Sequence, residues 1–245
     1  MPYREHIDDY IQFRGRAKDS YNILGPQFEK KRHDSDRFTG IALDTTNRWA
    51  VSVPGTSDTI AISEVQGGSA LITTGTADND SCMLSSAIIY SDTKNAEVEF
   101  RITITDVSGT ALFVGLSDAK TESNNAIALQ YPADTFTSTA TNAAGFVIDA
   151  DHATSSIMCA SVSANTDRTP VDTTVDWADG ETKTLRVRLL SDDSAIFFLD
   201  GLAVASIASS VASGTLLCAT VQAMTRANDG ANTVRVHSYD AWQDD

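Results

Sequence analysis

The chain has 245 residues, and 42% of them are hydrophobic, which is enough apolar material for the core of one large domain. Its formal net charge is −15. Phosphate backbones and anionic lipid surfaces are bound through Lys and Arg, so this charge argues against nucleic acid and membranes as partners.

The first 37 residues differ in composition from the rest and are predicted to form an attachment arm. They hold 8 of the 18 Lys and Arg and 7 of the 33 Asp and Glu, a net of +1, which leaves 10 basic and 26 acidic residues, a net of −16, for residues 38–245. Apolar side chains near the start recur as on one face of a short helix, and an extended segment ending in a basic cluster follows the Gly25-Pro26 break. The arm residues expected to contact a partner are Tyr3, Ile7, Tyr10, Ile11, Phe13, Lys30, Lys31 and Arg32.

From Phe38 onward, short runs rich in Ser, Thr, Ala, Val and Ile alternate with turn residues, which predicts many short strands. In Ala96–Thr105, strict alternation places Val98 and Phe100 on a buried face and Glu97 and Glu99 on a wet one. Asp200-Gly201 predicts a type I′ hairpin turn, because that turn needs a positive φ at both central residues. The other predicted strands are Arg48–Val53, Thr59–Ser63, Ala70–Thr74, Cys82–Ile89, Thr110–Ser117, Ala126–Tyr131, Gly145–Ile148, Ile157–Val162, Thr184–Leu189, Ala195–Leu199, Leu202–Ile207, Leu216–Met224 and Thr233–Tyr239.

These strands predict an all-β fold, a two-sheet antiparallel sandwich over residues 38–245. Its segments FRITITD, FVGLSD, AAGFVID and TLRVRLLSDDSAIFFLDG resemble the concanavalin A-like jelly-roll lectins and glucanases. The resemblance covers roughly Phe38–Asp245 and implies a jelly-roll sandwich. Cys82, Cys159 and Cys218 lie in apolar or small-residue strand patterns and are predicted to be buried free thiols.

The Ala-, Ser-, Thr- and Asp-rich sandwich with a short N-terminal arm is also similar to structural proteins of tailed-phage virions, capsid decoration (cement) proteins in particular. That resemblance implies a virion protein assembled in the host cytoplasm. It implies the major capsid protein or another virion protein as partner, and a homo-oligomer, for which a trimer would match a threefold position on a shell.

Catalysis would require recognisable patterns of acidic, histidine or nucleophilic residues in the sequence. A glycosidase of this superfamily needs paired carboxylates, and the glucanase branch carries them as Glu-x-Asp-x-x-Glu on one strand. The nearest fragment starts at Glu97, but Glu99 stands at the Asp position and Ile102 where the third acid should be. We therefore interpret Glu97 and Glu99 as acids on a solvent-facing strand surface. The histidines lack metal or triad spacing, and no phosphate loop is present, so the sequence predicts no enzyme and no cofactor.

Two weaker hypotheses concern ligands. The turns Asp78-Asn79-Asp80 and Asp149-Ala150-Asp151 each place carboxylates two residues apart, as a calcium ion could use, although a solvated turn is commoner. Trp49, Trp177 and Tyr131 could stack on sugar rings, although large aromatic side chains usually pack in cores.

The leading hypothesis is a non-enzymatic virion structural protein that binds its shell through the arm and exposes the sandwich. The first alternative is a carbohydrate-binding, lectin-like module of a virion fibre or head surface, and the second is a glycosidase of the concanavalin-like fold. Under the leading hypothesis, a chain that starts at Phe38 should fold but lose binding to the shell.

Overall fold

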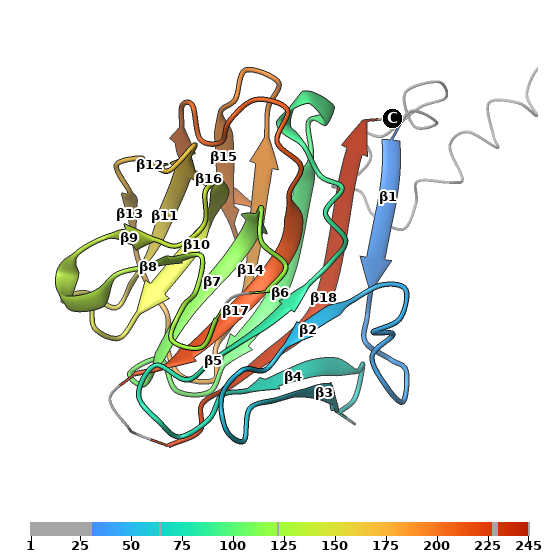
Figure 1. The fold of residues 1–245 in the computed structure, drawn as a ribbon, viewed down its shortest axis with the longest axis vertical. Helices are drawn as coiled ribbons and strands as arrows, with labels where there is room; N and C mark the ends of the chain where they lie inside the picture. The colour runs from blue at the N-terminus through green and yellow to red at the C-terminus, as the bar shows by residue number, and fades with distance from the viewer. Residues whose placement is uncertain (1–30, 64, 122, 227–229, 245) are drawn as a thin grey trace, which may run out of the picture.

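The structure is a computed structural model that describes residues 31–63, 65–121, 123–226 and 230–244. Over these ranges the chain forms two antiparallel sheets of eight strands each, packed face to face, and a small two-stranded sheet beside them (Figure 1). The predicted all-β, two-sheet jelly-roll sandwich is confirmed.

Consecutive strands repeatedly change sheet, as β4 to β5 and β6 to β7 do. The first sheet has the order β16 (Leu202–Ile207), β15 (Ala195–Leu199), β14 (Thr182–Leu189), β6 (Glu97–Ile104), β18 (Thr233–Asp244), β4 (Ser69–Thr73) and β3 (Thr59–Ser63), with β1 (Lys31–Asp36) also paired to β18. The second has the order β12 (Thr166–Asp167), β11 (Ser156–Ser163), β10 (Ala143–Asp149), β7 (Thr110–Ser117), β17 (Cys218–Thr225), β5 (Ser81–Ser85) and β2 (Ala50–Ser52), with β13 (Val171–Asp176) paired to β11. The small sheet is β8 (Leu129–Gln130) with β9 (Thr137–Ser138), and the short 3-10 turns are η3 (Asp92–Lys94) and η4 (Pro132–Asp134).

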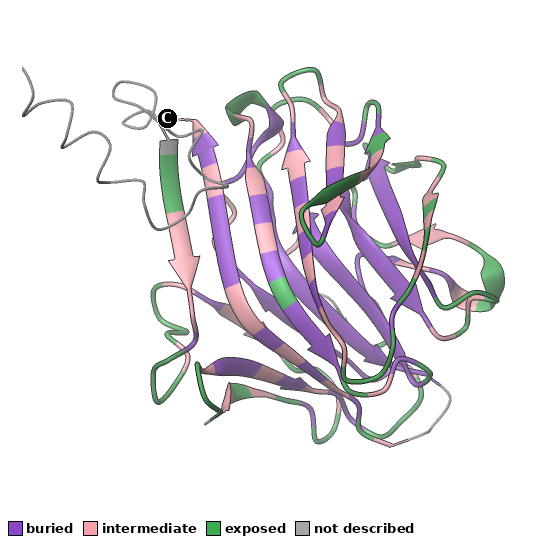
Figure 2. Ribbon diagram, turned by 180° about the vertical axis from the view of Figure 1, so that it is seen from behind, coloured by how far each residue is buried: buried purple, intermediate pink, exposed green. Residues whose placement is uncertain are grey.

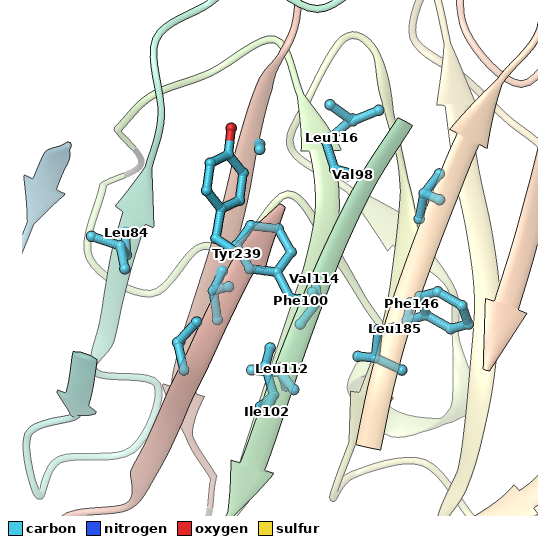
Figure 3. Close-up of a cluster of buried hydrophobic side chains, with 14 of the residues drawn as sticks. Leu84, Val98, Phe100, Ile102, Leu112, Val114, Leu116, Phe146, Leu185 and Tyr239 are labelled. Atoms are coloured by element: carbon cyan, nitrogen blue, oxygen red, sulfur yellow. The ribbon is translucent and has the colours of Figure 1, made fainter. Parts of the chain in front are cut away.

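The main core lies between the two sheets and follows the predicted alternation. Val98, Phe100 and Ile102 of β6 are buried, as predicted. The rings of Phe100 and Tyr239 lie 5.3 Å apart between centroids, and Figure 3 shows these side chains between the sheets with Leu112 of β7. Burial of aromatic and aliphatic side chains from both sheets is the main source of stability in such a fold.

Local turn chemistry accounts for the hairpin between β15 and β16. Asp200 has a φ of 49° and Gly201 a φ of 84°, so both central residues adopt the positive φ that the type I′ prediction required. The predicted strand Ala126–Tyr131 is mostly wrong, because only Leu129–Gln130 pairs as a strand, with Thr137–Ser138.

β1 lies inside the range predicted as the arm. It pairs antiparallel with the C-terminal half of β18, from Lys31 opposite Asp244 to Asp36 opposite Tyr239. Residues 31–37 are therefore part of the sandwich rather than of a separate arm, and the boundary predicted after residue 37 has to move to before β1. The predicted helix and the contact residues from Tyr3 to Lys30 lie outside the described residues.

The described residues contain no helix long and apolar enough to cross a membrane. Cys82, Cys159 and Cys218 are buried and free, as predicted. Burial raises the pKa of Cys159 and that of Cys218 to about 12, so both thiols are protonated at neutral pH.

Candidate functional site

The outer face of the second sheet is covered by the chain itself. β5, β7, β10, β11 and β17 are buried along their whole length, and Figure 2 shows their strands almost entirely purple. The described residues between β7 and β10, 118–121 and 123–142, include β8 and β9 and form this cover, and we call them the covering segment. Its apolar side chains complete a second buried cluster of Ala111, Phe113, Ile127, Ala128, Leu129, Tyr131, Ala140, Ala143, Val147, Met158, Ala160, Val162 and Met224.

Hydrogen bonds fix the covering segment to the sheet. The backbone N–H of Ala128 donates to Gln222 Oε1 of β17 at 2.6 Å, and the N–H of Tyr131 donates to Asp149 Oδ2 of β10 at 2.8 Å. Over the described residues, this sheet face is therefore a packed interior and not an open groove for an extended ligand.

Asp149 and Arg226 form a buried ion pair beneath the covering segment. Their side chains are 0% and 4% exposed, and the guanidinium contacts both carboxylate oxygens, at 2.9 Å from Nε and 2.6 Å from Nη2. Arg226 Nη2 also donates to Gln130 Oε1 at 3.2 Å. The calcium prediction for Asp149 and Asp151 is therefore wrong, because a guanidinium already occupies the place of the cation, and Asp151 Oδ2 lies 3.5 Å from Arg226 Nε.

The other predicted calcium turn is also engaged by protein groups. Asp78 accepts a hydrogen bond from the side chain of Asn79 at 2.9 Å, and Asp80 accepts one from Asn124 Nδ2, also at 2.9 Å. Asp80 is buried beside a second aspartate, Asp58, whose carboxylate accepts the N–H of Gly55 at 2.8 Å. Within the part of the chain that the structure describes, no three His, Cys, Asp or Glu side chains gather as metal ligands.

Glu97 and Glu99 lie on the outer face of the first sheet, as predicted. Arg186 Nη1 lies 2.9 Å from Glu97 Oε1, and Arg186 Nε lies 3.9 Å from Glu99 Oε2. The guanidinium of Arg186 also stacks 4.0 Å above the ring of Phe198. These acids belong to a cross-strand ion-pair ladder, so the interpretation as surface charges is confirmed.

The prediction of sugar-stacking residues is wrong, because all three side chains are buried. Trp49 is 2% exposed and its Nε1 donates to Asp36 Oδ2, whereas Trp177 is 3% exposed and its Nε1 donates to the carbonyl of Glu181. Tyr131 belongs to the covering segment, and it is 6% exposed because it packs in the second buried cluster. All three rings are interior packing, so none presents a face to a ligand.

A polar cleft lies where β1 approaches the loop that follows β5, and we call it the β1 cleft. Its volume is about 300 Å³, at the lower end of the range of small-molecule sites. Four separate segments supply its polar lining: Arg32, His33 and Asp34 from β1, Asn47 and Arg48 from the turn before β2, Ser86 and Tyr90 from the loop after β5, and Gln243 from the end of β18.

Hydrogen bonds order the inner side of the β1 cleft. Tyr90 shares a hydrogen bond with the hydroxyl of Tyr239, and burial raises the pKa of Tyr90 to about 12, so its hydroxyl is neutral at ordinary pH. Arg48 Nη2 donates to Asp34 Oδ1 at 2.7 Å. Across the strand, His33 stacks on Trp242 with 5.3 Å between ring centroids and contacts Asp240 at 3.3 Å. β1 is therefore held in one position over the cleft.

Two buried polar atoms of the cleft residues have no hydrogen-bond partner. Gln243 is 7% exposed, and its Oε1 is unpaired. Arg48 Nε is also unpaired, although it lies 3.4 Å from Asp36 Oδ2 in an ion pair without hydrogen-bond geometry. A buried polar atom without a partner costs about 1–3 kcal/mol. The lining residues Gln243 and Arg48 therefore carry an unpaired amide oxygen and an unpaired guanidinium nitrogen, and a hydroxyl group can act as donor or as acceptor.

Sequence reasoning marked only Arg32 among these residues and missed the cleft. Arg32 was assigned to partner binding by the arm, and the structure places it in β1 at the cleft. The side chain of Lys31 is outside what the structure describes. Because Arg32, Arg48, Tyr90 and Gln243 are far apart in the chain, no local spacing could have grouped them.

Comparison with known proteins places the fold among proteins that act on glycans. No family model matches the sequence, and no curated protein matches it. Among solved structures, the chain is similar to SCLam, a non-specific endo-β-1,3(4)-glucanase of family GH16, with a TM-score of 0.61, 11% identity, and coverage of 88% of this chain and 92% of that one. It is similar to the β-glucanase of Bacillus licheniformis, with a TM-score of 0.56, 10% identity, and coverage of 85% and 97%. A third similar structure comes from work on endo-acting O-glycanases of the human gut microbiota, with a TM-score of 0.62, 9% identity, and coverage of 86% and 99%.

These identities are low, so the likeness shows the shared fold alone. The likeness nevertheless overturns the prediction that the chain is no enzyme, because glycoside hydrolases share this fold. That prediction assumed that a sandwich without a recognisable acid motif is non-catalytic. The comparisons give no support to a virion or capsid role.

Proposed function

We propose that the protein binds a saccharide in the β1 cleft. The observation that carries the proposal is the unpaired Oε1 of Gln243, nine-tenths buried in the lining of a cleft of about 300 Å³. Sugar hydroxyls donate and accept hydrogen bonds at once, which matches a lining that mixes guanidinium, carboxylate, amide and hydroxyl groups.

The fold supports the same proposal from a different direction. The similar solved structures are named for action on β-glucans and O-glycans, so this sandwich is one on which glycan sites occur. In this chain the covering segment fills the outer face of the second sheet, and the β1 cleft is an open polar site that the described residues form.

Glycoside hydrolysis is the second candidate, and the shared fold of the hydrolases favours it. Hydrolysis by the usual route needs two carboxyl groups about 5 to 10 Å apart. Asp34 is the acid that lines the β1 cleft among the described residues, so the second group would have to come from elsewhere. Release of reducing ends from any glycan that binds tests this candidate directly.

Attachment to a virion shell through the predicted arm, residues 1–37, stays a separate prediction, as do the capsid partner, the host-cytoplasmic assembly and the trimer. It is tested by comparing shell binding of the full chain with that of a chain starting at Lys31, which keeps β1.

The saccharide proposal is tested with a glycan array followed by calorimetry on the best ligand. Replacement of Gln243 by Met keeps the side-chain size and removes the amide, so we expect affinity to fall about tenfold, as for the loss of one hydrogen bond. Gln66→Met, in an exposed loop outside the cleft, is the matched control and should bind as the unaltered chain does. Absence of any bound glycan, or equal binding by Gln243→Met, would refute the proposal.

A further inference from the structure

We propose that the saccharide is acidic and that its carboxylate faces Arg48 and Arg32, an inference that rests on the proposed function. These two guanidinium groups line the β1 cleft, and Asp34 is the acid that lines it with them. The lining thus holds two guanidinium groups and one carboxylate, with Asp36 Oδ2 3.4 Å from Arg48 Nε, in a chain whose residues 38–245 carry a net charge of −16.

The two arginines have different accessibility. Arg48 holds its place through Asp34 and the carbonyl of Ser35, with 31% of its side chain exposed. Arg32 is exposed at the edge strand. Both arginines line the same cleft as Tyr90.

The mixed lining favours a sugar acid over a simple anion. Gln243 Oε1 requires a donor, which a fully ionised inorganic anion does not offer, whereas ring hydroxyls do. A planar carboxylate also matches the fork of a guanidinium group, which binds it through two parallel hydrogen bonds. A uronic acid residue supplies both features within one sugar ring, and a cleft of about 300 Å³ suits a ligand of that size.

The negative charge of the rest of the protein should confine the binding of an anionic glycan to the cleft. The acidic body repels an anionic glycan over most of its surface, so attraction has to come from the cleft. Binding should therefore weaken as salt is raised, because part of the attraction is screened at the exposed Arg32.

The experiment compares the binding of two ligands to the full chain, oligogalacturonide as the free acid and as its methyl ester, which lacks the negative charge and carries a methyl group in its place. We expect the free acid to bind about tenfold more tightly than the ester, the effect of one charge-assisted hydrogen bond. Arg32→Gln should remove most of this preference for the free acid over the ester, and because Arg32 is exposed this variant should fold normally. Arg101→Gln, which removes an exposed arginine from the outer face of β6, is the matched control and should keep the preference.

Each other outcome has a distinct meaning. Equal affinity for acid and ester, or a preference that survives in Arg32→Gln, overturns the acidic-sugar inference and leaves saccharide binding in place. A sulfated sugar bound in preference to the carboxylate also overturns it. If no glycan of either charge binds in the array, the proposed function itself fails.

Discussion

Asp149 and Arg226 connect three parts of the chain at one point. Asp149 ends β10, Arg226 directly follows β17, and the pair holds the covering segment through Gln130 and the N–H of Tyr131. Neither charge could remain in this interior alone, because taking an unpaired ion out of water costs several kcal/mol. The position of the covering segment therefore depends on both Asp149 and Arg226.

Replacement of Asp149 by Asn should lower the free energy of unfolding by about 3–5 kcal/mol, because Arg226 would stay buried without its counter-charge. Urea denaturation followed by circular dichroism measures this. Asp151→Asn removes the same charge two residues later from a side chain that is 42% exposed, and it should cost less than about 1 kcal/mol. Equal losses in the two variants would show that the buried pair does not stabilise the fold.

For single residues, the sequence could predict which side chains are buried but not which side chains they contact. Strict alternation in Ala96–Thr105 placed Phe100 in the core and Glu97 on the surface, because the period of a strand alone decides the side. The partner of Asp149 is 77 positions away, so a pair of acids in a turn looked like a calcium site until the fold brought Arg226 to it.

β1 is a strand without apolar residues, and its contacts explain why it is ordered. Arg37, directly after it, reaches Asp240 of β18 with both terminal nitrogens, at 2.7 and 3.1 Å, and the Asp240 side chain is 6% exposed. The hydrogen bond to Asp240 raises the pKa of Arg37 further above its ordinary value, so the guanidinium of Arg37 stays charged at all working pH values. β1 thus closes the edge of β18 beyond the point where β4 ends.

A chain that starts at Phe38 should consequently be less stable than one that starts at Lys31. The shorter chain lacks β1 and leaves Asp240 buried without Arg37, so we expect a loss of about 3 kcal/mol or more. Thermal unfolding of both truncated chains measures the difference. Identical midpoints would mean that residues 31–37 belong functionally to the arm, as the sequence first suggested.

Element prediction succeeded where composition and alternation agreed. Thr110–Ser117, Ala195–Leu199 and Leu202–Ile207 match the observed strands residue for residue. β1 and β13 were missed because their polar sequences, KRHDSD and VDTTVD, carry no apolar period and pair only at sheet edges. Ala126–Tyr131 looked like a strand because it is apolar, but its burial comes from covering a sheet face.

The whole molecule combines a strongly acidic surface with protonated groups in its interior. Burial raises the pKa of Tyr90 from 10.0 to about 12, and those of Cys159 and Cys218 from 9.0 to about 12. A group whose pKa is higher in the folded state stabilises that state fully below its unfolded pKa and loses this contribution as pH rises toward the folded value. Stability should thus be insensitive to these groups below about pH 9 and fall between about pH 9 and pH 12.

Alkaline unfolding, followed by circular dichroism and by tyrosinate absorbance, tests this expectation. The cooperative loss of structure should begin at a pH at which Tyr90 is still protonated. In Cys218→Ala, the free energy of unfolding, compared with the same variant at pH 7, should fall less steeply as the pH rises. A fold that ionises Tyr90 at pH 10 without unfolding would contradict the burial assigned to it.

At the scale of the molecule, the sandwich could be predicted because strand periodicity and turn residues are local signals. The β1 cleft could not, since Arg32, Arg48, Tyr90 and Gln243 meet only after both sheets have formed. The composition of residues 1–37 favours a functional role for this segment, and β1 lines one side of the candidate site.

The covering segment turns this sandwich into a three-layered body, in which the central strands of the second sheet have protein on both sides. Within β10, a side chain at Gly145 would collide with the ring of Phe113, so even the smallest addition to this face is resisted. A ligand groove on this sheet face could therefore be engineered only by removing the covering segment. That change would expose apolar strands to solvent and would make the protein prone to aggregation.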